Sequence, residues 1–281
     1  MSEQDSGGIE ALCRTISGLN EQSVSKPTLV YFDIIGIAWP IRCALHLAGV
    51  DHDLIQISIG EWSQRDSSGA QVVKRCFRNG HVPLYVDQDV YLNQSTVIMD
   101  YLATKHDLAG DHEKERRAIA EVCAHAYDAL FHWSGLLQII IKRGIPDDVV
   151  EARKEAYMGR GVWGVATGGF AGHLDGFVRY LEANPSRSGY FVGNRLSMAD
   201  LHAFNVLCNW YKAFAPETFS GSYPQLDAFI HRIAATPRVK DYIDNLQEPT
   251  TWFNLPQIAI RLTSPEELQG LVSGQASSPI P

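Results

Sequence analysis

The chain has 281 residues, of which 45% are hydrophobic and 20% charged, an ordinary composition for a globular protein with a sizeable core. Its formal net charge of −8 argues against nucleic acid or an anionic membrane surface as the main partner. No apolar run is long enough to cross a bilayer, and the first 27 residues lack the charged-then-apolar order of a signal peptide, so we expect a cytoplasmic protein.

The first 27 residues are rich in Ser, Gly and Glu, and we expect them to form a flexible extension. The segment from Ile9 to Leu19 could form a weak amphipathic turn or two. Stronger patterns begin at Thr28. Residues 29–32 predict a strand, residues 38–48 a helix that Gly49 ends, and residues 54–57 a second strand.

A polar stretch over 60–71 then predicts a loop and a poorly formed helix. Residues 83–86 and 90–92 flank the turn Asp87-Gln-Asp and predict a β-hairpin. Gln94 and Ser95 begin a helix that runs to about residue 105. The first hundred residues therefore read β-α-β, a link, then β-β-α.

Beyond Gly110 the pattern is helical. Ser197 can cap one helix, because Asp200 can reach back to the amide of the capping residue. Predicted helices cover 112–142, 148–183 (interrupted by glycines), a segment from Ser197, 224–235 and 237–245. We therefore predict a mixed α/β domain over 28–106, a linker near 106–111, an all-helical domain over 112–246 and a C-terminal extension over 247–281.

The turn after the first strand carries a single candidate chemical group. Between Tyr31 and Arg42 there is no Cys or Ser, so the turn offers no thiol or serine nucleophile. The Tyr31 phenol, with an ordinary pKa of about 10, can act there only as a hydrogen-bond donor or a weak acid. By itself, a strand tyrosine is more often a packing residue.

Five cysteines are scattered along the chain without a Cys-x-x-Cys pair. This dispersed, odd-numbered set argues against a disulfide framework, a zinc site and redox chemistry at the turn, so we expect no metal. The cysteines are Cys13, Cys43, Cys76, Cys123 and Cys208.

Several motifs in order resemble the cytosolic glutathione S-transferases, in particular the tyrosine-type sigma, pi, mu and alpha classes. The resemblance covers about residues 28–246 and implies a thioredoxin-like N-terminal domain, an all-helical C-terminal domain and a homodimer. Its motifs are Val30-Tyr31-Phe32 with Gly36, Asn79-Gly-His-Val82-Pro83, Leu92-Asn-Gln94-Ser95-Thr-Val-Ile98, Tyr101-Leu-Ala, and Gly193-Asn-Arg-Leu-Ser197-Met-Ala-Asp200-Leu.

The resemblance implies a binding role in glutathione recognition for each of several residues. Pro83 would be a cis-proline that presents the Val82 backbone to the cysteinyl part of the ligand, an added-strand mode of peptide binding. Gln94 and Ser95 would hold the γ-glutamyl carboxylate at a helix start. Asp128 would reach the γ-glutamyl amine across the dimer interface. Without the resemblance these are an edge-strand proline, a helix cap and a solvated carboxylate.

The other end of glutathione is a glycine carboxylate. The resemblance assigns it to Trp62 and Lys74, and Arg75 could substitute for Lys74. Tyr31 would donate its hydrogen bond to the glutathione thiolate, the form of a thiol that attacks electrophiles.

The turn departs from the family pattern. The tyrosine classes usually carry Arg beside the glycine, where this chain has Ile35 and Ile37. Trp39 stands where Glu is frequent, and His81 replaces the usual Gln or Lys. These changes make the turn more apolar and remove a charge that would help to activate a thiolate.

A pocket for the electrophile would lie between this turn and the inner face of the first long helix. We expect Ile37 and Trp39 on one side and Ser134 and Gln138 on the other. Aromatic residues at helical spacing are more often core than pocket. Trp252 and Phe253 could close over the pocket.

Three functions fit these features. The first is a glutathione S-transferase, with glutathione as co-substrate, that adds the thiolate to a small apolar electrophile, as in detoxification. The second is a glutathione-dependent isomerase or a specialised biosynthetic enzyme, which the apolar turn and the extensions favour. The third is a non-catalytic glutathione-binding or structural protein of the same fold.

Overall fold

The computed structural model describes residues 3–19, 23–34, 36–141, 146, 148, 149, 152, 169–208 and 221–245. The chain divides into two compact units, one of residues up to 102 and one of residues 103–245, and each is described by itself. Within these described ranges, no helix combines the length and apolar character that crossing a membrane requires.

The N-terminal unit is built on a four-stranded mixed sheet of order β2-β1-β3-β4. β1 (Val24–Phe32) runs parallel to β2 (Asp53–Ile57) and antiparallel to β3 (Leu84–Gln88). β3 forms a hairpin with β4 (Val90–Asn93). This topology, with the helical unit that follows, confirms the predicted thioredoxin-like domain and all-helical second domain.

The helix between the parallel strands is delimited as its sequence predicts. A 3-10 turn, η1 (Gly36–Ala38), leads into α2 (Trp39–Ala48). Pro40 stands in the first turn of α2, where its missing N–H costs nothing. Gly49 ends the helix at φ 66°, a left-handed conformation that glycine adopts without a steric penalty.

The polar link contains two short helical segments. α3 (Ile59–Ser63) begins with a capping box between Ser58 and Glu61. η2 (Val73–Cys76) is a single 3-10 segment that carries Lys74 and Arg75. After the hairpin, α4 (Ser95–Lys105) starts at the residue that the sequence predicts.

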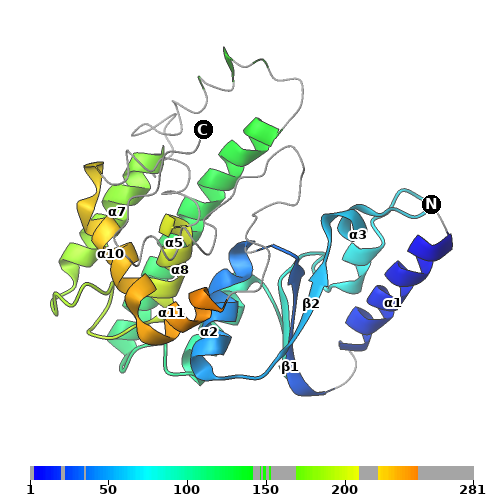
Figure 1. Cartoon of the computed structure of the whole chain (residues 1–281), viewed down its shortest axis with the longest axis horizontal. Helices are drawn as coiled ribbons and strands as arrows, with labels where there is room; N and C mark the ends of the chain where they lie inside the picture. The colour runs from blue at the N-terminus through cyan, green and yellow to red at the C-terminus, as the bar shows by residue number, and fades with distance from the viewer. Residues whose placement is uncertain are drawn as a thin grey trace. The chain divides into compact units, whose positions relative to one another are not determined.

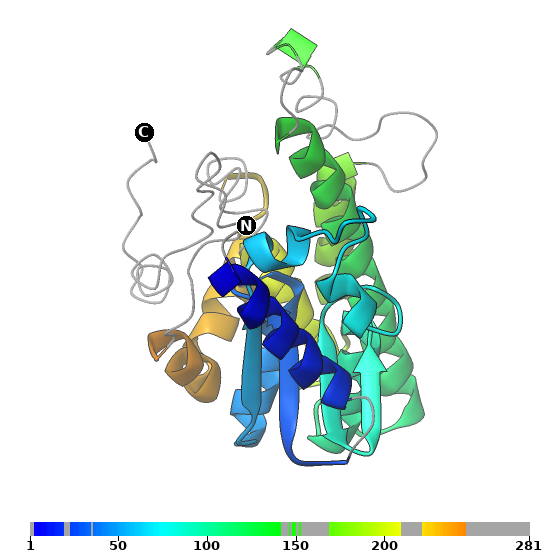
Figure 2. The same cartoon turned by 90° about the vertical axis from the view of Figure 1, so that its right-hand side faces the viewer.

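The flexible N-terminal extension is a prediction that the structure corrects. Residues Glu3–Leu19 form a helix, α1, and Val24 already belongs to β1. In Figure 1, α1 and α2 lie on opposite sides of the sheet, and Figure 2 shows α1 in front of the strands. The helix is anchored by apolar side chains on one of its faces, because Ile16 is 0% exposed.

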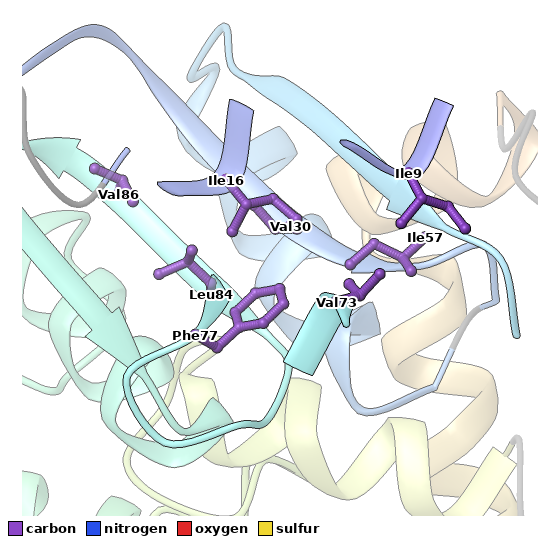
Figure 3. Close-up of a cluster of buried hydrophobic side chains, with 8 residues drawn as sticks. All are labelled: Ile9, Ile16, Val30, Ile57, Val73, Phe77, Leu84 and Val86. Atoms are coloured by element: carbon purple, nitrogen blue, oxygen red, sulfur yellow. The ribbon is translucent and has the colours of Figure 1, made fainter. Parts of the chain in front are cut away.

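This face of the sheet has its own hydrophobic core. Ile9 and Ile16, two turns apart on α1, point toward the strands and η2 (Figure 3). The buried members are Ile9, Ile16, Val30, Ile57, Val73, Phe77, Leu84 and Val86. An isolated helix with this sequence would be marginal, so tertiary packing is what stabilises α1.

The second unit consists of helices. α5 (Glu113–Ile141) packs against α7 (Gly169–Ala183) and α8 (Met198–Val206). α10 (Pro224–Ala235) contacts α7, α8 and the following α11 (Pro237–Asp244). These bounds agree with the predicted helices. The predicted break within 148–183 and the extension over 247–281 fall largely or wholly outside the described residues.

The start of α8 is fixed by a buried carboxylate, as predicted. Asp200 Oδ2 accepts hydrogen bonds from the Ser197 amide at 2.8 Å and from the Ser197 hydroxyl at 2.7 Å. Asp200 Oδ1 accepts from the Phe191 amide at 2.9 Å. The Asp200 carboxylate therefore joins the start of α8 to the loop before it.

The predicted linker is also held within this unit. Arg195 pairs with Asp107 at 2.7 Å and with Asp111 at 2.6 Å, and the Met198 amide donates to the Leu108 carbonyl at 3.0 Å. The segment before α5 is thus bound to the segment that leads into α8.

Candidate functional site

The turn after β1 encloses the hydroxyl group of Tyr31. The Ile37 amide donates a hydrogen bond to the Tyr31 oxygen at 3.2 Å. Gly36 has a φ of 48°, and a side chain at this position would overlap the Tyr31 hydroxyl and ring. The turn therefore requires glycine both for its backbone conformation and for its contact with the phenol.

Burial controls the ionisation of Tyr31. The side chain is 4% exposed, and this burial raises the pKa of Tyr31 to about 12, although the Ile37 amide and Arg42 act in the opposite direction. The phenol therefore keeps its proton at neutral pH. Because its oxygen already accepts from Ile37, the O–H group is suited to donate to another acceptor.

Arg42 is a part of the turn that the sequence analysis missed. Its guanidinium donates to the Ile34 carbonyl at 3.1 Å and to the Phe32 carbonyl at 3.2 Å, and it lies 5.7 Å from the centroid of the Tyr31 ring. The side chain is only 1% exposed. The sequence does contain a sign of this role, because Arg42 interrupts the apolar run of α2. Buried arginines are rare unless they have partners.

The Val82–Pro83 peptide bond is cis, as the resemblance implies. Val82 packs with Tyr31 in a small apolar cluster that also includes Ile34, Ala38 and Ile37. The backbone that precedes β3 is thereby brought next to the phenol.

Asn93, another missed residue, links this loop to the start of α4. Its side-chain amide donates to the His81 and Pro83 carbonyls, both at 3.2 Å. Gln94 follows with a φ of 80°, and its carbonyl accepts from the Val97 and Ile98 amides. A left-handed conformation is unusual for glutamine and occurs often at functional sites. Ser95 is buried as the first residue of α4.

Trp62 and Lys74 also come together. The Lys74 ammonium lies 5.4 Å from the centroid of the Trp62 ring. Trp62 in turn contacts Phe32 edge-on, with ring centroids 5.2 Å apart, and Phe32 adjoins Tyr31. Both predicted glycine-carboxylate residues therefore connect to the Tyr31 turn through aromatic contacts.

Arg75 is engaged elsewhere, because its guanidinium pairs with Asp66 at 2.8 Å. Asp66 also accepts hydrogen bonds from Ser68 and Ala70, and these bonds, Ser68 foremost, lower the pKa of Asp66 to about 2. The pair orders the loop before η2 and leaves Lys74 as the better placed cation for a ligand.

The predicted electrophile pocket is less defined. Ile37 is half-buried beside Tyr31. Trp39 is 1% exposed, so its indole offers no surface to a bound molecule and we correct it to a packing residue. Ser134 and Gln138 lie on α5, but their side chains, Ile35, Trp252 and Phe253 are outside the described residues.

Asp128 lies in the helical unit, on α5. Its carboxylate is exposed. Burial lowers the pKa of the neighbouring His125 imidazole, and the Asp128 charge acts in the opposite direction. Two exposed aromatic side chains, Tyr127 and Phe131, lie on the same helix close to Asp128.

The residues gathered in the N-terminal unit can bind an extended anionic peptide. The Val82 segment offers backbone groups, the start of α4 suits one carboxylate, and Lys74 with Trp62 suits another. The Tyr31 side chain shares an apolar cluster with Val82. The described part of this turn contains no cysteine that could act as a nucleophile.

Comparison with protein families gives two matches. Residues 27–104 match the glutathione S-transferase N-terminal domain, and residues 168–245 match the glutathione S-transferase C-terminal domain. Together the two matches cover more than half of the chain. The first begins after α1, which is therefore an addition to the matched domain.

Individual proteins agree with these matches. The chain is 28% identical to glutathione S-transferase P 1 of Xenopus laevis over 76% of this chain and 90% of the relative. It is 28% identical to a glutathione S-transferase of Dermatophagoides pteronyssinus over 83% of this chain and 96% of the relative. The solved sigma-class enzyme of Fasciola hepatica has a similar fold, with a TM-score of 0.63, 21% identity and coverage of 85% and 98%.

Proposed function

The chain belongs to the glutathione S-transferase family, and from that premise we propose that it is a transferase that adds the glutathione thiolate to a small apolar electrophile. The observation that carries this proposal is the buried, protonated Tyr31 hydroxyl packed beside the cis Val82–Pro83 loop. In the reaction the thiol loses its proton, and the thiolate sulfur bonds to the electrophilic carbon. Tyr31 stabilises the thiolate by donating a hydrogen bond.

Glutathione would lie along the segment from Lys74 to Ser95. The Val82 backbone, at the cis bond before Pro83, would pair with the cysteinyl residue. Gln94 and Ser95 would bind the γ-glutamyl carboxylate at the start of α4, and Lys74 with Trp62 would bind the glycine carboxylate. Asp128 of a second copy of the chain would contact the γ-glutamyl amine.

The apolar turn shapes the second-substrate site. Ile37 supports an apolar electrophile, and Ser134 and Gln138 are proposed polar residues of that pocket. This chain lacks the arginine that the tyrosine classes usually carry beside the glycine of the turn. Arg42 can compensate for that loss, because it places a positive charge next to the Tyr31 ring. This charge favours a catalytic protein over one that only binds glutathione.

We expect Ser95→Ala to weaken glutathione binding by about tenfold, because it removes a hydroxyl that donates to the γ-glutamyl carboxylate. Isothermal titration calorimetry with glutathione measures the effect. Ser17→Ala, a change on α1, is the matched control and should bind like the wild type. Equal affinity of Ser95→Ala and wild type, or no heat of binding with either, would contradict the proposed glutathione site.

We also propose a homodimer that uses the α5 surface around Asp128. Phe131 is 68% exposed there and Tyr127 is exposed one turn before it, so two large aromatic side chains are available to pack against a second copy. Phe131→Ser should shift the protein from dimer to monomer in light scattering at micromolar concentration. A wild type that is monomeric at that concentration would overturn the dimer.

A further inference from the structure

The added helix α1 places a cysteine against the glutathione-binding unit. Ile9, Leu12, Cys13 and Ile16 recur at three- and four-residue spacing, so they share one face of the helix. All four pack on the core cluster beneath the sheet, where Figure 3 shows Ile9 and Ile16 directed at the residues of η2 and the strands. Cys13 is therefore on the face of α1 that packs toward η2, where its side chain is partly buried.

A second cysteine meets it from η2. Cys76 is the last residue of η2 and packs on the same cluster, with its thiol 3.9 Å from the Val72 carbonyl. α1 and η2 pack against each other, and the Cys13 and Cys76 side chains lie on the same cluster, near enough for the two thiols to interact although they are far apart in the sequence. Both side chains are partly exposed, whereas Cys43 and Cys208 are buried.

The surroundings make this pair slow to react at neutral pH. Burial and the neighbouring Cys76 thiol raise the pKa of Cys13 to about 12; Arg75 acts against this shift and Glu10 adds to it. The Cys13 thiol is therefore a slow nucleophile at neutral pH. Once one of the two cysteines has formed a mixed disulfide, however, the other lies near it on the same cluster, so closure to a protein disulfide is intramolecular and favoured.

We propose that Cys13 and Cys76 are a redox modification site that closes to a disulfide between α1 and η2, with glutathione disulfide as the oxidant. One thiol loses its proton and attacks glutathione disulfide, which releases one glutathione and leaves a mixed disulfide on the protein. The second thiol, also deprotonated, attacks the protein sulfur of that mixed disulfide and releases the second glutathione. Two protein thiols are oxidised, and one glutathione disulfide is reduced to two glutathione molecules that take up the two protons.

The bond would connect two elements with different roles. α1 lies outside the matched family domain, and η2 carries Lys74 and leads into the Val82–Pro83 loop. A disulfide between them closes a long loop, which restricts the unfolded chain and stabilises the folded unit. Formation of the disulfide does not depend on Tyr31 or on transferase activity.

The test is peptide mapping of the full chain after incubation with excess glutathione disulfide at mildly alkaline pH. Remaining thiols are alkylated, and the protein is digested with trypsin without reduction. Trypsin releases Cys13 in the peptide 1–14 and Cys76 in the peptide 76–78. The expected product is these two peptides joined by a disulfide that dithiothreitol separates.

Three variants complete the experiment. Cys13→Ser and Cys76→Ser should each abolish the joined peptide, and Cys123→Ser, which removes a partly exposed cysteine on α5, should leave its yield unchanged. Recovery of Cys13 and Cys76 from wild type as alkylated thiols would overturn the proposal. Their recovery as separate glutathione adducts would overturn it equally.

Discussion

Asp200→Ala should lower the free energy of unfolding of the helical unit by about 3 kcal/mol, because it leaves three buried donors without their acceptor. The carboxylate accepts hydrogen bonds from the Phe191 amide, the Ser197 amide and the Ser197 hydroxyl, at 2.9, 2.8 and 2.7 Å. Asp200 itself is fully buried, so water cannot replace it without opening the core. Urea unfolding followed by circular dichroism measures the loss.

A surface carboxylate at another helix start provides the control. Glu113 begins α5 and pairs with Arg116 and Arg117, but it is well exposed. Glu113→Ala should change the unfolding free energy by less than about 1 kcal/mol. An equal loss of unfolding free energy in the two variants would contradict the claim that the buried Asp200 hydrogen bonds stabilise the helical unit more than an exposed ion pair does.

Tyr31→Phe should lower kcat/KM for glutathione conjugation by about 100-fold. A hydrogen bond to a charged sulfur contributes about 2–3 kcal/mol, and phenylalanine fills the same space, so the fold is retained. The measurement is conjugation of glutathione to an apolar aryl electrophile. Tyr180→Phe is the matched control, because that hydroxyl binds Glu121 in the helical unit and should not affect the rate.

The pH dependence of the same variant gives an independent check. Because the pKa of Tyr31 is raised to about 12, the wild type keeps its donor protonated up to about pH 10. In Tyr31→Phe, bound glutathione must ionise without this donor, so kcat/KM of the variant should rise with pH. The ratio of kcat/KM between wild type and variant should therefore fall as the pH increases. A ratio of kcat/KM that stays constant from pH 6 to 9 would argue against a role for Tyr31 in thiol ionisation.

Most elements could be predicted from local sequence signals. Pro40, Gly49 and Ser197 mark helix ends for backbone reasons that act within a few residues, and the hairpin turn is equally local. α1 could not be predicted, because Gly7, Gly8 and Gly18 lower the helix propensity of its segment. Its stability comes from the packing of Ile9 and Ile16 on a sheet formed by later residues.

The candidate site likewise contains residues that could be predicted from local sequence and residues that could not. Tyr31, Val82, Ser95 and their motif partners have fixed spacings, and the contacts among Tyr31, Val82, Trp62 and Lys74 agree with those spacings. Arg42 and Asn93 act through carbonyl groups of other segments, so their roles required the tertiary structure. Trp39 was misassigned because an aromatic residue beside a site is indistinguishable in sequence from one in the core.

The central claim is that the Tyr31 hydroxyl stabilises the thiolate of bound glutathione. Its most direct test is an absorbance titration of the thiol of bound glutathione in wild type and in Tyr31→Phe. We predict that the pKa of this thiol lies about one to two units lower in wild type than in Tyr31→Phe, about 1.36 kcal/mol for each unit. The same thiol pKa in both proteins would contradict the claim.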